Sequence, residues 1–376
     1  MSLTSLQYSE FRGQPRHWTL KECDFQDFNL VVGRNSTGKT RLINVLVGLI
    51  KILTGRQTDA YESGRYKATV VLSSKKYVFE IEFSENKVVR ESLTVDGNKR
   101  LVRNKDGTGK IFYQSLQRFL EFHVDDKLIA FQQRVDELQH PFVAALSKWA
   151  LGARAFSFNT SFSNTTVSPL TRLQESSRKI SEVMEQDVVG TYYRGYSLYE
   201  DAFDVAIKRD MKKIGYELTD VGATDINLLG QKHNIPDTLF GIFASEKGVN
   251  VAIPATQMSQ GMFRALGLII YINSVVLAGD HTIVVIDDIG EGLDYERSIA
   301  LIDVLREHSK KGKIQVIMTT NDRFVMNRVP LENWVILRRR KSVVSAFTER
   351  NSEEKFKNFR YMGLSNFDLF ASPEFK

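Results

Sequence analysis

Residues 31–40 read VVGRNSTGKT, and this stretch decides the fold. It contains the complete pattern Gly-x-x-x-x-Gly-Lys-Thr, which runs from Gly33 to Thr40. The apolar run FNLVV precedes it and is typical of a buried strand. The segment RLINVLVGLIKILTG follows it, with apolar residues at helical spacing and a predicted stop at Gly55. A strand, a glycine loop and a helix in this order are the context in which such a loop cradles phosphates.

The residue types of this loop have a direct physical use. Glycines let backbone N–H groups turn toward an anion, and the N-terminus of the following helix adds the positive end of a dipole. Lys39 would reach the β- and γ-phosphates of a nucleotide, and the Thr40 hydroxyl would ligate Mg²⁺. We therefore expect the loop to contact the nucleotide through Gly33, Arg34, Asn35, Ser36, Thr37, Gly38, Lys39, Thr40 and Arg41.

A second GTGK sequence lies at residues 107–110, but it has no upstream glycine at the required spacing. Ile111 occupies the position of the metal-binding hydroxyl, and alternating apolar and polar residues flank the segment. These features favour a hairpin turn over a second phosphate site.

A metal-holding carboxylate is expected to accompany the phosphate loop, and residues 281–294 (HTIVVIDDIGEGLD) supply a candidate. The run TIVVI predicts a central parallel strand, and open α/β sheets bind ligands beyond the carboxyl ends of such strands. We assign Asp287 to the metal site. Asp288 would orient the attacking water or accept its proton. Taken alone, the segment also fits a solvated acidic loop.

Residues 258–266 (MSQGMFRAL) lie just before an apolar helical run. Ser259 is predicted to be the N-cap, with its hydroxyl free, and Gly261 would let the backbone approach a phosphate closely. A simple helix start is the alternative for this segment in isolation. Further on, the strand KIQVIMTT is followed by Asn321.

The order of these parts resembles that of ABC-type ATPases, and most of all the RecF/SMC/OLD-like group among the AAA-family ATPases of bacteria. The likeness covers residues 25–55 and 255–345. The ending at 359–370 is similar to the tail of a small subfamily that lacks a long coiled coil, of the kind found in anti-phage defence modules. The resemblance implies an α/β fold: an ATPase head with a mixed sheet, an antiparallel β lobe and a helical insertion.

The resemblance also implies roles for individual residues, with ATP and Mg²⁺ as cofactors. Ser259, Gln260 and Gly261 would meet the γ-phosphate of ATP that is bound to a second subunit. Asp294 falls on the aspartate of the loop at the dimer seam. Asp288, Lys39 and Asn321 would be the catalytic residues. The family usually has glutamate at position 288 and often histidine at position 321, and both departures point to slow hydrolysis.

We expect three regions: residues 1–150, with the phosphate loop and the antiparallel β lobe; residues 151–235, a helical insertion or lid; and residues 236–376, with the remaining motifs. Alternation over residues 65–104 predicts the antiparallel lobe. No heptad pattern persists long enough for a coiled-coil arm.

Composition limits location and partners. The chain has 376 residues, a net charge of +6 and a single cysteine, Cys23, which fits a reducing compartment. The sequence predicts no signal peptide, and the apolar stretch 266–279 is too short to cross a bilayer. We therefore expect a cytoplasmic protein without a membrane partner. The basic run 338–341 fits a solvated turn better than a nucleic-acid contact.

The resemblance suggests a head-to-tail dimer or a higher oligomer that controls a protein effector such as a nuclease or toxin in antiviral defence. The resemblance is also compatible with a nucleic-acid partner. Two alternatives remain open at this stage. One is a RecF-like DNA-repair ATPase that binds duplex DNA, and the other is an ATP-bound structural clamp that barely hydrolyses.

Overall fold

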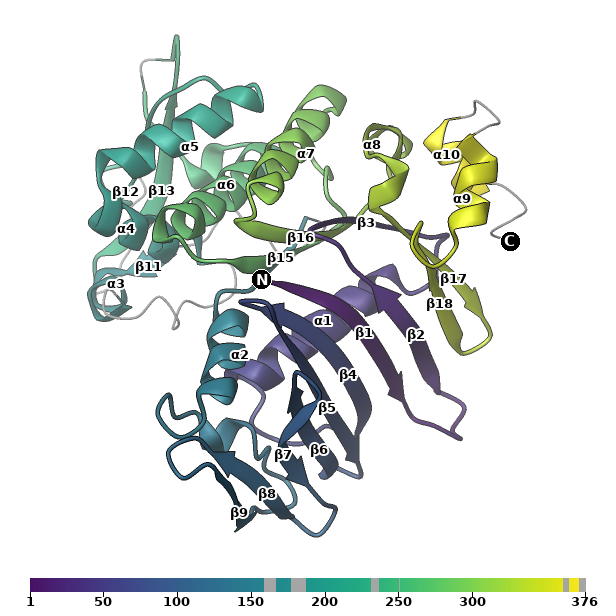
Figure 1. The fold of residues 1–376 in the computed structure, drawn as a ribbon. Coiled ribbons are helices and arrows are strands. Elements are labelled where there is room, and N and C mark those ends of the chain that lie inside the picture. Colours follow the sequence, from purple (N-terminus) through teal and green to yellow (C-terminus); the bar gives the residue numbers. More distant parts are fainter. Residues whose placement is uncertain (159–166, 177–186, 231–236, 250, 361–364, 372–376) are drawn as a thin grey trace. The chain divides into compact units, whose positions relative to one another are not determined.

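The computed structural model describes residues 1–158, 167–176, 187–230, 237–249, 251–360 and 365–371 (Figure 1). The chain divides into two compact units, each described here by itself. The first unit is Met1–Ala153 together with Ile317–Lys376, and the second unit is Arg154–Val316. The chain returns to the first unit within β16 (Ile314–Thr319), whose six residues are all buried.

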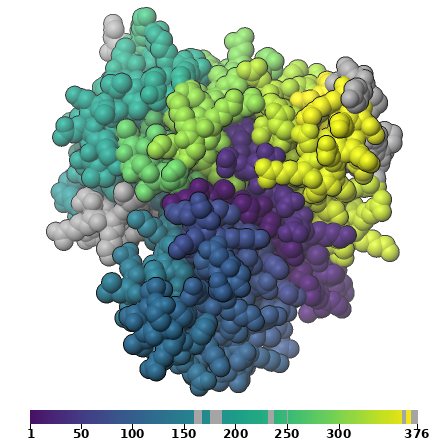
Figure 2. All heavy atoms as spheres, viewed as in Figure 1, coloured from purple at the N-terminus to yellow at the C-terminus, as the bar shows by residue number. Residues whose placement is uncertain are grey.

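A large mixed sheet forms the first unit, in the strand order β3-β17-β18-β2-β1-β4-β5-β6-β7-β8-β9. β17 pairs with β3 and β18 with β2 in parallel, and the other neighbours are antiparallel. Figure 2 accordingly shows N-terminal residues in purple beside C-terminal residues in yellow. The strands are β1 (Ser2–Glu10), β2 (Trp18–Asp24), β3 (Phe28–Val32), β4 (Ser63–Leu72), β5 (Lys75–Ser84), β6 (Lys87–Val95), β7 (Asn98–Arg103), β8 (Thr108–Tyr113), β9 (Arg118–His123), β17 (Trp334–Arg340) and β18 (Val343–Phe347).

The strand–loop–helix prediction for the N-terminal segment is confirmed. All five residues of β3 are buried, and α1 (Lys39–Thr54) begins inside the loop. Its apolar face is buried and the helix ends at Gly55, which adopts the left-handed conformation with φ 74°. The other helices of this unit are α2 (Pro141–Leu151), α8 (Arg323–Arg328), α9 (Glu353–Arg360), α10 (Asn366–Ala371) and the short 3₁₀ turns Gln132–Arg134 and Leu331–Asn333.

The antiparallel lobe is also confirmed, as strands β4 to β9. The GTGK sequence at residues 107–110 lies at the turn between β7 and β8, where the Asn104 N–H donates to the Thr108 carbonyl at 2.8 Å. Inside the lobe, the fully buried Glu91 accepts the N–H groups of Ala130 and Phe131 at 2.8 and 2.7 Å. This carboxyl therefore fixes the segment that follows β9.

The second unit contains a parallel strand pair, a small antiparallel sheet and several helices. β15 (Thr282–Asp287) pairs in parallel with β10 (Arg154–Ser157) and is buried throughout, as expected for TIVVI. In the small sheet, β13 lies between β11 and β12, and β14 also pairs with β13. The remaining elements are β11 (Val167–Pro169), α3 (Leu170–Ser176), α4 (Val188–Tyr199), α5 (Asp201–Lys213), β12 (Leu218–Asp225), β13 (Leu239–Glu246), β14 (Ile253–Pro254), the 3₁₀ turn Ala255–Gln257, α6 (Gln260–Ala278) and α7 (Tyr295–Lys310).

The region predicted as a helical insertion, residues 151–235, contains α3, α4 and α5 but also strands. β12 lies within the region and pairs with β13, which lies beyond its end. The sequence of β12, LTDVGATD, has only one large apolar residue in its middle, Val221, so its strand character depends on the partner strand. Residues 159–166, 177–186 and 231–235 of this region lie outside the described residues.

Helix α6 is longer than the apolar stretch noted in the sequence. Among the residues that the structure describes, it is the one helix long and apolar enough to cross a membrane. Of its most apolar 18-residue stretch, 78% is buried inside the protein. The expectation that this segment is too short to cross a bilayer does not hold for the whole helix, which has 19 residues. Its burial is that of a helix in a protein core.

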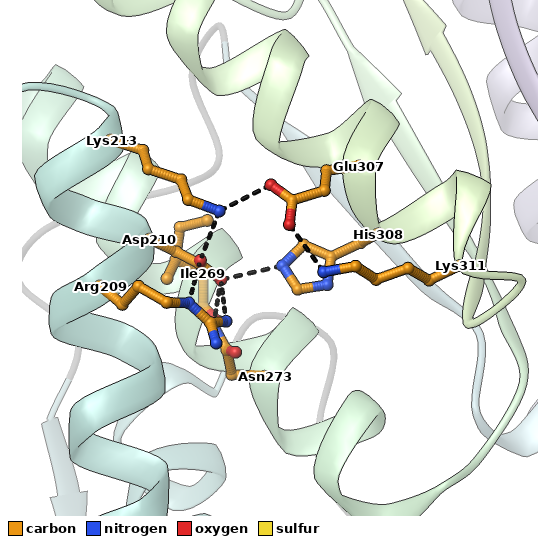
Figure 3. A network of polar contacts seen from close by, with 8 residues as sticks. All are labelled: Arg209, Asp210, Lys213, Ile269, Asn273, Glu307, His308 and Lys311. Carbon is orange, nitrogen blue, oxygen red and sulfur yellow. Dashed lines mark hydrogen bonds and ion pairs between the residues drawn. The ribbon is translucent and has the colours of Figure 1, made fainter.

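Helix α5 is joined to α6 and α7 by a buried carboxylate, Asp210 (Figure 3). Asp210 accepts hydrogen bonds from Asn273 of α6 and His308 of α7, at 3.1 and 2.8 Å. Arg209 donates to the same carboxylate at 2.9 Å, and Lys213 bridges it to Glu307 nearer the surface. These bonds fix three helices of the second unit at one point.

Candidate functional site

The phosphate loop of the first unit has two glycines that no other residue could replace without strain. A Cβ atom on Gly33 would lie 2.4 Å from Thr37 Oγ1 and 3.2 Å from the carbonyl oxygen of Leu337. Gly38 has φ 108°, and a Cβ atom there would lie 3.2 Å from the Trp18 ring. Steric contacts therefore require glycine at both positions. The packing of the Trp18 ring against the loop is not evident from the sequence.

Hydrogen bonds within the loop hold its shape. Thr37 Oγ1 donates to the Arg34 carbonyl at 2.8 Å, and Lys39 Nζ donates to the Gly33 carbonyl at 2.7 Å. Ser36, at the tip, has φ 65°, which is unusual for a residue with a side chain. The loop thus curls around the Lys39 ammonium, whose side chain is buried.

The first turn of α1 has the features of an anion site. No side chain among the described residues caps the helix at Gly38, and the positive end of the helix dipole lies at this turn. Thr40 lies in this turn and is exposed, as a metal-binding hydroxyl must be. Arg41 pairs with Glu10 and stacks its guanidinium 4.7 Å from the Trp18 ring centroid. These residues fit a bound nucleotide phosphate, with Thr40 available to Mg²⁺.

The acidic pair of the second unit lies at the carboxyl end of β15. Asp287 is the last residue of the strand and is 4% exposed, opposite Ser157 of β10. Its carbonyl accepts the Phe158 N–H at 3.0 Å, which fixes the strand end. Asp288 follows in the left-handed conformation with φ 55°, so the chain turns sharply there and the two carboxylates come from different backbone conformations.

Helix α6 begins as predicted, with Ser259 as its N-cap accepting the Met262 N–H at 3.2 Å. The Ser259 hydroxyl, predicted to be free, accepts this N–H of its own helix and also interacts with the Tyr216 side chain. Burial raises the pKa of Tyr216, and the nearby Arg297 and Ser259 oppose the rise. Ser259 remains exposed, so a ligand can still reach it.

Gly261 has a use that the sequence did not reveal. A Cβ atom there would lie 2.1 Å from the carbonyl oxygen of Gly292, so only glycine lets α6 and the GEGLD loop approach so closely. The buried Arg264 strengthens this contact by donating to the Glu291 carbonyl at 2.9 Å and to Gln260 Oε1 at 3.2 Å. The SQG segment and the GEGLD loop therefore form one packed structure.

Asp294 is the N-cap of α7. Its carboxylate accepts the Arg297 N–H at 2.9 Å and pairs with the Arg297 guanidinium at the same distance. That guanidinium lies 4.4 Å from the centroid of the Tyr216 ring. Because Tyr216 also contacts Ser259, one aromatic residue connects both predicted subunit-contact residues. We call Ser259, Tyr216, Asp294 and Arg297 the seam cluster.

Asn321 is exposed and follows β16 in the first unit. Its neighbours fix the turn, since the Asp322 N–H donates to Thr320 Oγ1 at 3.1 Å and Asp322 caps α8. Thus Lys39, Thr40 and Asn321 belong to the first unit, while the acidic pair and the seam cluster belong to the second.

Comparison with known proteins gives the family. A family described as an AAA domain, putative AbiEii toxin, Type IV TA system, matches residues 28–327, and the chain belongs to it. No curated protein matches the chain. The fold is similar to that of a solved SMC head bound to the C-terminal winged-helix domain of ScpA, with a TM-score of 0.57 and 13% identity over 95% of this chain and 100% of that one.

A second solved structure, an SMC head with an extended coiled coil bound to the C-terminal domain of ScpA from Pyrococcus furiosus, has a TM-score of 0.50. It shares 12% identity over 95% of this chain and 99% of that one. Identities this low establish the fold alone. Together with the family, they confirm an ABC-type AAA-family ATPase fold of the SMC, RecF and OLD class, as the order of the motifs predicted.

Proposed function

We propose that this protein binds Mg·ATP and hydrolyses it slowly. The observation that carries this proposal is the glycine loop that runs from Gly33 into the N-terminus of α1, where helix amides, the Lys39 ammonium and the Thr40 hydroxyl come from neighbouring residues, as a triphosphate site requires. Bound magnesium would neutralise phosphate charge, and Thr40 with Asp287 would hold it. Asp288 would position and deprotonate the attacking water, and Asn321 would donate a hydrogen bond to the γ-phosphate.

Calorimetry tests the binding step. We expect heat on titrating Mg·ATP into the folded chain and at least a tenfold weaker affinity, about 1.4 kcal/mol, for Lys39→Ala. A matched control is Lys51→Ala, in the last turn of the same helix, which should leave the affinity unchanged. Folded wild-type protein that gives no heat would contradict the proposal.

We further propose that two copies, or a higher oligomer, close head to tail around ATP through the seam cluster. Ser259 and Asp294 are exposed on the second unit and joined through Tyr216 and Arg297, which supports a shared docking surface. Ser259→Arg should leave ATP binding by the monomer intact but abolish ATP-dependent association in light scattering. Unchanged association would reject this step.

The dimer would act as an ATP-gated sensor or scaffold in the cytoplasm that controls a partner effector, such as a nuclease or toxin, in antiviral defence. The family description, which mentions a putative toxin of a Type IV toxin–antitoxin system, supports this proposal. The related SMC heads are bound to ScpA, which supports partner binding by this fold. A pull-down from native cells that recovers no partner, with or without ATP, would argue against it.

A RecF-like function on duplex DNA is the second candidate. A groove of about 760 Å³ on the β1, β2 and β4 face of the first unit favours it, since Arg12, Lys21, Arg65 and Lys67 are among its lining residues. Glu82 and Glu80 neutralise two of these charges, at 3.8 and 3.2 Å, which weakens the case. ATP-dependent DNA binding should fall steeply with salt if this candidate holds. Weak binding at every salt concentration would eliminate it.

A further inference from the structure

Strand β17 runs alongside the phosphate loop and contacts it at two places. Near the start of the loop, the carbonyl oxygen of Leu337 would lie 3.2 Å from a Cβ atom on Gly33. At the tip, Arg339 Nη1 donates a hydrogen bond to the carbonyl oxygen of Ser36 at 3.2 Å. β17 pairs with β3 in parallel and continues past the end of β3, so its last residues lie beside the phosphate loop.

The Arg339 guanidinium is itself held in place. Its Nε atom donates to the carbonyl of Lys341 at 2.7 Å, within the turn that joins β17 to β18. One side of the planar group is thus fixed to the hairpin, and the other side reaches the loop. A flexible surface side chain would lose more entropy in holding a single carbonyl than this anchored group does.

Ser36 is the residue of the loop that most needs such a contact. With φ 65° it is in the left-handed region, which disfavours a residue with a Cβ atom, and its side chain is exposed. A non-glycine residue stays in this region only where its surroundings hold it there. The carbonyl held by Arg339 belongs to this residue, so the contact acts at the strained point.

We propose that Arg339 is a positioning residue that holds the phosphate loop in its binding shape through the Ser36 carbonyl and thereby sets the affinity for nucleotide. This inference rests on the proposed ATP binding. Arg339 does not touch the reacting atoms in this proposal; it reduces the ordering that the loop must undergo when phosphate binds. The adjacent Arg340 has the same charge, but successive residues of a strand point to opposite faces.

The test compares Arg339→Ala, Arg339→Lys and the control Arg340→Ala in the full chain. In nucleotide-free protein, we expect the amides of residues 33–40 to exchange hydrogen several-fold faster in Arg339→Ala than in wild type. In steady-state hydrolysis, KM for ATP should rise about tenfold with kcat unchanged, since the lost contact acts on binding. Arg339→Lys should recover part of both effects, and Arg340→Ala should show neither.

Exchange at residues 33–40 that is equal in wild type and Arg339→Ala would overturn the inference, as would an equal KM rise in Arg340→Ala. If Arg339→Ala does not fold, Arg339→Lys tests the inference in its place. A lysine ammonium cannot bond the carbonyls of both Ser36 and Lys341 as the guanidinium does, so this variant should still have a raised KM for ATP. Wild-type protein that binds no ATP would defeat the proposed function instead. The exchange measurement would still judge Arg339.

Discussion

The Asp210 Oδ2 atom accepts a hydrogen bond from His308 Nε2 at 2.8 Å although both side chains are almost fully buried. Burial alone would raise the pKa of the Asp210 carboxyl. Hydrogen bonds from His308, Arg209 and Asn273 outweigh burial and hold this pKa well below its usual range. The carboxylate is therefore ionised in the folded protein and supports the packing of α5 on α6 and α7.

Asp210→Asn should lower the free energy of unfolding by about 2 kcal/mol at pH 7, because the amide cannot satisfy all the buried donors. The loss should shrink as the pH falls below about 4, since an aspartate with a depressed folded-state pKa stabilises only above its unfolded-state value. Urea denaturation at several pH values measures both effects. The control Glu307→Gln removes the surface part of the network and should cost less than about 0.5 kcal/mol.

Glu91 should show the opposite pH dependence. Burial raises the pKa of this carboxyl to about 7, against hydrogen bonds from Phe131 and Ala130. The folded state then keeps a proton that the unfolded state releases, so wild-type stability should fall by about 3 kcal/mol between pH 4.5 and pH 7 from this group. Relative to wild type, Glu91→Gln should therefore gain stability as the pH rises. A constant difference in urea denaturation would show that Glu91 titrates normally.

Gly38→Ala should abolish ATP binding while the chain stays folded. The added methyl would meet the Trp18 ring at 3.2 Å in a backbone conformation, φ 108°, that alanine disfavours. Gly97 provides the matched control, since it also has a positive φ, 81°, but no atom within 4 Å of the added Cβ. Gly97→Ala should lose about 1 kcal/mol of stability and keep its ATP affinity. Equal affinities in calorimetry would refute the role of the tight turn.

Asp288→Asn should separate slow hydrolysis from the structural clamp. Asparagine tolerates the left-handed backbone at this position, φ 55°, but cannot accept a proton. We expect kcat to fall about a hundredfold with little change in ATP affinity. Phosphate release that is the same in wild type and variant would favour the barely hydrolysing clamp.

Asp287→Asn should instead weaken the magnesium dependence of ATP binding.

Local sequence patterns were sufficient for the elements around the phosphate loop. The run of five buried residues before Gly33 and the helical spacing after it are properties of contiguous residues, and the structure confirms both. The hairpin at residues 104–110 followed from alternation for the same reason. Asp287 was likewise placed at a strand end by its own neighbours.

Contacts between distant segments were not visible in those patterns. Arg339 was noticed only as part of a basic run, because its bond to Ser36 spans 303 positions. Tyr216 gave no signal of its contact with Ser259, and the need for glycine at position 261 arises from Gly292. The strand β12 was missed because it depends on its partner β13. Each case is a tertiary contact that overrides the local sequence signal.

Gly261 and Gly292 meet at one end of α6 and α7, while Asp210 ties the same two helices together nearer their other ends. Contacts near both ends of α6 and α7 oppose translation of one helix along the other and a change in their crossing angle. We therefore expect the two helices to move as a rigid body. A second protein chain that binds at Asp294 and shifts α7 would then displace α5 as well. A displacement of α5 would likewise change the position of Ser259. Communication across this unit would need no unfolding and no separate relay.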